Sequence, residues 1–215
     1  MVAAMTGRIG RKAGLAIGTL ASIAATPALA HHPLGGELPT TMAHGLLSGV
    51  GHPVIGLDHL AFVIGVGIAA RMIGRPLVAP IAFVAATIAG TLIHLQAIGL
   101  PGVEPAIALS VVAIGLAIML RASAALMLPL FALAGLFHGH AYGEAVFGAE
   151  PTPVLAYLVG FGATQWAIAV AAGLAAERAA RAWSEAMPQR LAGAAIAGAG
   201  AIVVGEHALA AMGLG

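Results

Sequence analysis

Six long apolar stretches follow one another along this chain, separated by short segments of turn-forming residues. A helix that crosses a bilayer needs about 20 mostly apolar residues, and each stretch approaches or exceeds that length. They lie near residues 53–71, 77–98, 103–120, 124–142, 153–176 and 191–213. The separators contain Gly74-Arg75-Pro76, Gly99-Leu100-Pro101-Gly102, Pro151-Thr152-Pro153 and Pro188, which favour turns. The pattern predicts an all-α integral membrane protein with six transmembrane helices.

The composition agrees with a chain whose main solvent is lipid. Hydrophobic residues make up 60% of the sequence and charged residues 8%, and the mean hydropathy is +1.02, whereas soluble domains carry about 25% charged residues. There is no cysteine, which excludes disulfides and thiolate metal ligands. A formal net charge of +1 points to no nucleic-acid partner. The sequence has no nucleotide-binding glycine loop and no room for a soluble domain.

Residues 1–30 predict a cleavable signal peptide, which would leave residues 31–215 as the six-helix domain. A basic head with Arg8, Arg11 and Lys12 precedes an apolar run over residues 13–25. Ala28-Leu29-Ala30 then forms a small-x-small cleavage site. The alternative is an uncleaved first helix. Cleavage would expose His31 and His32 beside a free α-amine, a group able to capture a metal ion, although a pair of incidental terminal histidines is an equal alternative.

The basic residues predict the orientation in the membrane. Every arginine of the mature chain falls in the loops after the first, third and fifth predicted spans, and the intervening loops have neither Lys nor Arg. Positive loops remain in the cytoplasm, so we expect an inner-membrane protein with both mature termini in the periplasm. This agrees with the signal peptide. The residues concerned are Arg71, Arg75, Arg121, Arg178, Arg181 and Arg190.

The nine histidines lie outside the predicted cytoplasmic half of the membrane. His31 and His32 are external, and His44 and His52 precede or begin the first span. His59 lies about two turns inside that span. The remaining histidines are placed near the outer ends of the second, fourth and sixth spans: His94, His138, His140 and His207, the last beside Glu206.

The spacing of these residues predicts a shared site. His52, Gly56 and His59 stand at i, i+4 and i+7, so one regular helix would place them on one face. Asp58 would point about a quarter turn away, either coordinating a metal ion or positioning a histidine from another helix. His140 and Glu144 are also at i, i+4, whereas His138 and His140 would diverge. We expect Gly49, Gly51 and Pro53 to break the chain just before the first span. Irregular backbone at membrane depth is tolerated where it lines a cavity, so we expect a cavity there.

Imidazole and carboxylate ligands without thiolate suit Ni²⁺, Co²⁺ or Zn²⁺, with Fe²⁺ and Mn²⁺ as alternatives. The candidate metal ligands are His52, Asp58, His59, His44, His94, His138 and His140, with Glu144, Glu206 and His207 as possible secondary groups. The competing interpretation of each is a structural hydrogen-bonding role. For the other polar residues we favour ordinary roles. Helix–helix hydrogen bonding is favoured for Thr91, Gln96, Thr164 and Gln165, with the lining of a path as the alternative. We expect packing or interface positions for Tyr142, Tyr157 and Trp166, and a solvated helix end for Glu177, Arg178 and Arg181.

The segment from His52 to His59, with His44-Gly45 before it and His138-Gly139-His140 later, closely resembles the HupE/UreJ family. The resemblance covers nearly all of the mature chain. It implies a membrane permease for nickel, or sometimes cobalt, that is associated with hydrogenase and urease systems. It also implies that His52, Asp58 and His59 bind metal, with His44, His138 and His140 as further members. The segment is similar to the His-x4-Asp-His signature of a larger nickel/cobalt transporter family, but five residues separate His52 from Asp58 here.

These observations predict a permease, not an enzyme, that imports Ni²⁺ from the periplasm, with Co²⁺ as the close alternative. The preference for Ni²⁺ comes only from the resemblance. The ion is cargo, and we expect no organic cofactor. Two other classes are open: a membrane-embedded metalloenzyme that activates water, and a metal sensor or chaperone that binds without transport. Polar groups that continue towards the cytoplasm, and transport of the ion along them, would distinguish a permease from the metalloenzyme and from the sensor or chaperone.

Overall fold

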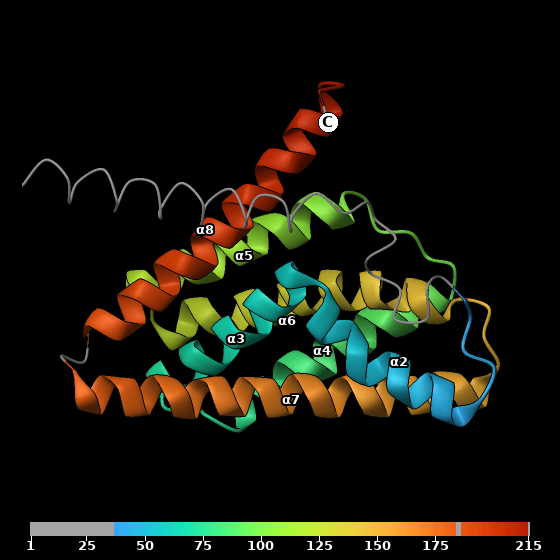
Figure 1. The fold of residues 1–215 in the computed structure, drawn as a ribbon, viewed down its shortest axis with the longest axis horizontal. Coiled ribbons are helices and arrows are strands. Elements are labelled where there is room, and N and C mark those ends of the chain that lie inside the picture. The colour runs from blue at the N-terminus through green and yellow to red at the C-terminus, as the bar shows by residue number, and fades with distance from the viewer. Residues whose placement is uncertain (1–36, 184–185, 215) are drawn as a thin grey trace, which may run out of the picture. The chain divides into compact units, whose positions relative to one another are not determined.

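The computed structural model describes residues 37–183 and 186–214. Every regular element in these residues is helical (Figure 1), which confirms the all-α class. The signal peptide predicted over residues 1–30, and His31 and His32 after it, lie outside the described residues. With the labels of Figure 1, the elements in chain order are α2 (Met42–Ile55), α3 (Leu57–Met72), α4 (Val78–Leu95), α5 (Val103–Met119), α6 (Ala124–Gly143), the 3₁₀ turn η2 (Glu144–Val146), α7 (Pro151–Ala182) and α8 (Ala186–Ala211).

Each of the six predicted stretches contains a helix, and the lengths and compositions of several fit a membrane. Four of the described helices, α4, α6 with η2, α7 and α8, are long and apolar enough to cross one. Helices α2 and α3 meet that criterion only together, as one broken span or re-entrant loop, which would bring the number to five. Helix α5 is apolar but has 17 residues, about 26 Å at 1.5 Å per residue.

The first predicted span is broken at Gly56, and the prediction that Gly49, Gly51 and Pro53 break the chain is wrong. Helix α2 runs through those three residues, and the axis then turns by 81° into α3. Gly56 has an extended backbone (φ −75°, ψ 109°), and a Cβ there would lie 2.7 Å from the His59 ring. Gly49 serves helix packing instead, since a Cβ there would lie 2.3 Å from the Tyr157 carbonyl oxygen.

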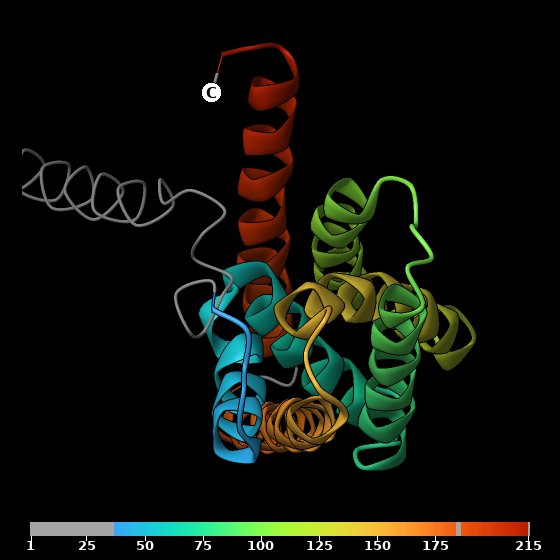
Figure 2. The ribbon, with the colours of Figure 1, turned by 90° about the vertical axis from the view of Figure 1, so that its right-hand side faces the viewer.

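The helices pack in pairs whose directions can be followed from close backbone contacts. Helix α2 lies beside α7 (Figure 2), and α3 continues along the same helix further down. Contacts advance in the same sense on both partners, so both pairs are parallel: Gly45 with Pro153, Gly49 with Tyr157 and Gly67 with Ala169. Helices α4 and α6 are also parallel, and α5 and α8 are antiparallel, because Gly115 meets Ala197 and Gly200 meets Val112. These directions agree with six alternating spans.

Small residues allow the paired helices to touch, as is common in membranes. A Cβ at Gly139 of α6 would lie 2.0 Å from the Thr87 carbonyl oxygen of α4, and one at Gly67 would lie 1.9 Å from the Ala169 carbonyl oxygen of α7. At both positions the obstacle is backbone, which a small rotamer change cannot relieve. Glycine is therefore required for these two helix pairs to approach.

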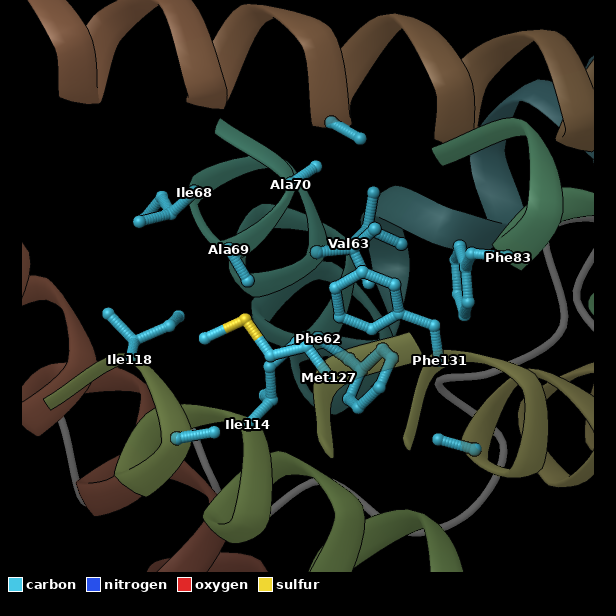
Figure 3. Close-up of a cluster of buried hydrophobic side chains, with 14 of the residues drawn as sticks. Phe62, Val63, Ile68, Ala69, Ala70, Phe83, Ile114, Ile118, Met127 and Phe131 are labelled. Atoms are coloured by element: carbon cyan, nitrogen blue, oxygen red, sulfur yellow. The ribbon is translucent and has the colours of Figure 1, made fainter. Parts of the chain in front are cut away.

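A central apolar cluster holds α3 to its neighbours. Phe62 of α3 lies against Phe83 of α4, with ring centres 5.4 Å apart, and Met127 and Phe131 of α6 complete its surroundings (Figure 3). Outside this cluster, large apolar side chains such as Leu155 (64% exposed) face outward. In water such a surface would favour aggregation, whereas lipid solvates it.

One end of the bundle gathers arginines from three parts of the chain. A cavity of about 520 Å³ is lined by Arg71 in the last turn of α3, Arg121 just after α5 and Arg181 in the last turn of α7. Glu177 pairs with both Arg71 and Arg181, and its side chain is 28% exposed. Arg181 is exposed as expected for a solvated helix end, whereas Glu177 is only partly exposed and joins α7 to α3 through Arg71. The gathering of these arginines at one end of the bundle agrees with the predicted topology, in which all basic residues of the mature chain lie on one side of the membrane.

Candidate metal site

The break at Gly56 places His52 and His59 on two different helices. The prediction that they share one helix face is therefore wrong, because the i, i+7 relation holds only within a continuous helix. The 81° turn nevertheless brings the two rings together, with centres 5.9 Å apart. Both side chains are 3% exposed. The bend between α2 and α3 thus brings His52 and His59 together, which we had expected from one continuous helix.

Asp58 stands in the first turn of α3, where its Oδ1 accepts the His59 backbone N–H at 2.8 Å. A carboxylate is stabilised there by the unpaired N–H groups of a helix start. The side chain is 9% exposed. It is also close enough to His138 and Tyr142 to interact with them electrostatically. The carboxyl group thus lies among the histidines of α2, α3 and α6.

His138 of α6 joins this group through two hydrogen bonds. Its Nδ1 lies 2.7 Å from Nδ1 of His59, and its Nε2 lies 2.9 Å from the Ser110 hydroxyl of α5. The Ser110 hydroxyl donates its single hydrogen to the Ile107 carbonyl at 2.7 Å, so it must accept from His138. The Nε2 of His138 therefore carries a proton. We call His52, Asp58, His59 and His138 the inner cluster.

The hydrogen bond from His138 Nε2 to Ser110 also determines which ring nitrogen of His59 carries the proton. His138 is fully buried, where a charged imidazole is costly. In the neutral ring with Nε2 protonated, Nδ1 is an acceptor. It receives the Nδ1–H of His59, so the lone pair of a neutral His59 is on Nε2.

A second chain of hydrogen bonds has the same effect on His52. The Tyr157 hydroxyl of α7 donates to the Tyr142 carbonyl at 2.8 Å, and it lies 2.8 Å from Nδ1 of His52. Since its hydrogen is already used, it accepts the His52 Nδ1–H. The lone pair of a neutral His52 is therefore also on Nε2, the nitrogen that a metal ion would bind.

Tyr142 lies between the two histidines, with ring centres 4.8 Å from His52 and 4.5 Å from His59. Its hydroxyl is buried and has no hydrogen-bond partner among the described residues. Buried polar groups are normally satisfied, and an exception commonly marks a bound water or ion. We predicted packing or interface positions for Tyr142 and Tyr157. The available sequence signals were the place of Tyr142 two residues after His140 and Ser110 as a lone hydroxyl in an apolar helix, whereas no local signal marked Tyr157.

His94 and His140 form a separate outer pair. Their Nδ1 atoms lie 3.3 Å apart, and Nε2 of His140 donates to the Ile98 carbonyl at 3.0 Å. Glu144 is exposed but interacts electrostatically with His94. His138 and His140 diverge from α6 as expected, one towards α3 and α5 and the other towards α4. The structure thus divides the candidate set in two.

The other candidates lie away from these groups. The His44 side chain is exposed in the first turn of α2, where its backbone N–H is capped by the Thr41 hydroxyl, about 12 Å along the helix from His52. Glu206 is exposed and His207 partly exposed near the end of α8. Within the described ranges, no three His, Asp or Glu side chains are arranged as they stand to hold one ion. Binding by the inner cluster would therefore require its side chains to move.

Comparison with known proteins places the chain in a family. Residues 19–203 match the family described as HupE / UreJ protein. The chain belongs to the HupE/UreJ family. It is 36% identical over 196 residues to Protein HupE from Rhizobium leguminosarum bv. viciae, covering 86% of this chain and 95% of that protein. No solved structure matches it. The HupE/UreJ match contains the inner cluster and the outer pair, whereas Glu206 and His207 lie beyond it.

Proposed function

We propose that this HupE/UreJ protein is an inner-membrane permease that imports Ni²⁺ from the periplasm, with Co²⁺ as the close alternative. In this role it would supply nickel for a hydrogenase or urease. The main support is the pair of hydrogen-bond chains that place lone pairs on Nε2 of His52 and His59, beside the Asp58 carboxylate. Two neutral imidazoles and a carboxylate suit both ions.

The geometry of the inner cluster is compatible with a shared ion. Metal–nitrogen bonds of about 2.1 Å put the ring centres of two imidazoles on one ion roughly 5–6 Å apart, and those of His52 and His59 are 5.9 Å apart. We propose that the ion is bound by these two Nε2 atoms and by Asp58, whose side chain turns towards it. His138 then positions His59 and does not touch the ion.

The Tyr142 hydroxyl, which has no hydrogen-bond partner among the described residues, supports an ion that keeps part of its water. The Tyr142 ring packs against both histidine rings, and a hydrogen bond from its hydroxyl to metal-bound water would satisfy that group. The outer pair, with Glu144 beside it, is placed to receive the ion first. An ion moving inward would pass from His94 and His140 to His52 and His59, and His31, His32 and His44 would assist its capture.

The test is uptake of labelled nickel and cobalt by cells that express the chain. His52→Ala, Asp58→Asn and His59→Ala are expected to abolish uptake, whereas His207→Ala serves as the matched control and is expected to transport normally. Absence of uptake by the wild type would refute a permease. Metal binding by the purified protein without uptake would favour a sensor or chaperone. Normal uptake by all three variants would refute the proposed site.

A further inference from the structure

Below the inner cluster, a buried amide belongs to α7. Gln165 is fully buried, eight residues after Tyr157 and twelve before Glu177. At 1.5 Å per residue these separations are about 12 Å and 18 Å along the helix. Along α7, Gln165 therefore lies between Tyr157, which contacts His52, and Glu177 at the arginine-rich end of the bundle.

The orientation of this amide follows from its one hydrogen-bond partner. The Thr87 hydroxyl of α4 donates its hydrogen to the Val84 carbonyl at 2.8 Å and lies 3.3 Å from Nε2 of Gln165. Because that hydrogen is used, Thr87 can only accept from Gln165. The atom facing Thr87 is therefore the amide nitrogen, which donates to the hydroxyl oxygen.

This orientation leaves the side-chain oxygen of Gln165 facing away from Thr87. Gln165 Oε1 is buried and has no hydrogen-bond partner among the described residues. A polar atom without a partner in an apolar region is costly, and it persists where a water or an ion satisfies it. A carbonyl oxygen accepts hydrogen bonds and coordinates cations, so a cation or a cation-bound water suits it and an anion does not.

Gln165 is also connected to the inner cluster. Thr87 packs on Gly139, the residue after His138, so closely that a Cβ at Gly139 would touch the Thr87 backbone. The Thr91 hydroxyl, one turn from Thr87 on α4, donates to the Gly139 carbonyl at 2.8 Å. Buried polar groups thus connect Gly139, beside His138, through Thr91 and Thr87 of α4 to Gln165 of α7.

We propose that Gln165 Oε1 is a second cation-binding position, which receives the divalent ion after it leaves the inner cluster. This inference rests on the proposed permease function. A single neutral oxygen binds weakly, which suits a transient position because a transported ion must be able to leave.

The experiment uses the full chain in proteoliposomes with a metal-sensitive dye inside and Ni²⁺ outside. Gln165→Leu and Gln165→Met keep the side-chain volume and remove the oxygen. We expect the initial uptake rate to fall by about tenfold, because passage loses a coordinating group at this depth. Nickel affinity of the detergent-solubilised protein, set by the inner cluster, is expected to stay unchanged. Thr164→Val, a neighbouring polar residue on α7, is the matched control and should transport normally.

Gln165→Glu, unlike Gln165→Leu and Gln165→Met, is expected to change nickel binding. The carboxylate would hold the ion more tightly at this position, so bound nickel should increase while uptake slows. Normal uptake by Gln165→Leu or Gln165→Met would overturn the inference, as would a parallel loss of nickel affinity, which would indicate that Gln165 only supports the inner cluster. Wild-type proteoliposomes that take up no nickel would refute the permease function itself, and this outcome is separate from the behaviour of the variants.

Discussion

Nδ1 of His59 lies 2.7 Å from Nδ1 of His138, although 79 residues separate them in the chain. Only one proton fits between two ring nitrogens at this distance. Its position is decided by Ser110, which can only accept from the far side of His138. A hydroxyl on α5 thereby determines which nitrogen of His59 carries the lone pair.

Ser110→Ala should therefore weaken nickel binding without removing a ligand. Loss of the acceptor lets the His138 proton move to Nδ1, which then opposes the Nδ1–H of His59 and releases its orientation. Removing such a positioning group typically costs about 10–100-fold in metal affinity, measurable by titration calorimetry. Nitrogen-15 NMR of labelled histidine should show altered tautomers. Ser110→Thr keeps the hydroxyl and should restore both properties, and wild-type affinity in Ser110→Ala would contradict the relay.

Tyr157→Phe and Tyr142→Phe form a matched pair with different expected effects on stability. Tyr157→Phe removes the acceptor of the His52 proton and a donor to the Tyr142 carbonyl, so we expect a loss of about 1–3 kcal/mol and weaker nickel binding. Tyr142→Phe removes a hydroxyl without a partner in the described residues and should leave stability unchanged or raised. Thermal unfolding in detergent separates the two, and equal destabilisation would contradict this assignment.

Gly139→Ala should prevent α4 and α6 from packing. A Cβ there would meet the Thr87 backbone at 2.0 Å, and overpacking costs about 1–3 kcal/mol or more. Gly198→Ala on α8 is the control, because nothing lies within 4 Å of its Cβ position. There the change should stabilise the helix by about 0.5–1 kcal/mol. Folded yield and thermal unfolding measure both, and a Gly139→Ala protein as stable as the wild type would show that the helices can separate.

Reporter fusions test the orientation. A reporter after Arg121 or Arg181 should be active in the cytoplasm, because both residues line the same cavity at the basic end and positive loops remain inside. A reporter after Gly148, in the loop between η2 and α7, should be active in the periplasm. A periplasmic reading at Arg181 would reverse the orientation.

Much of this protein could be predicted from its sequence, because apolar length and residue type are local properties. The six apolar stretches each contain a helix, and the motif from His52 to His59 led to the correct family. The divergence of His138 and His140 also followed from helix geometry. The error at the first span came from the same local reasoning, since a glycine that permits packing and one that breaks a helix look alike in sequence.

The tertiary structure decided which faces meet. It turned the chain by 81° at Gly56 and set His59 against His138 and His94 against His140. It also gave Ser110, Tyr157 and Gln165 their partners. Apart from the turn at Gly56, these relations join residues far apart in the chain, on helices that glycines allow to pack closely. A one-dimensional pattern carries no information on such contacts, so the sequence alone determined the helices and the family, and packing decided the candidate site.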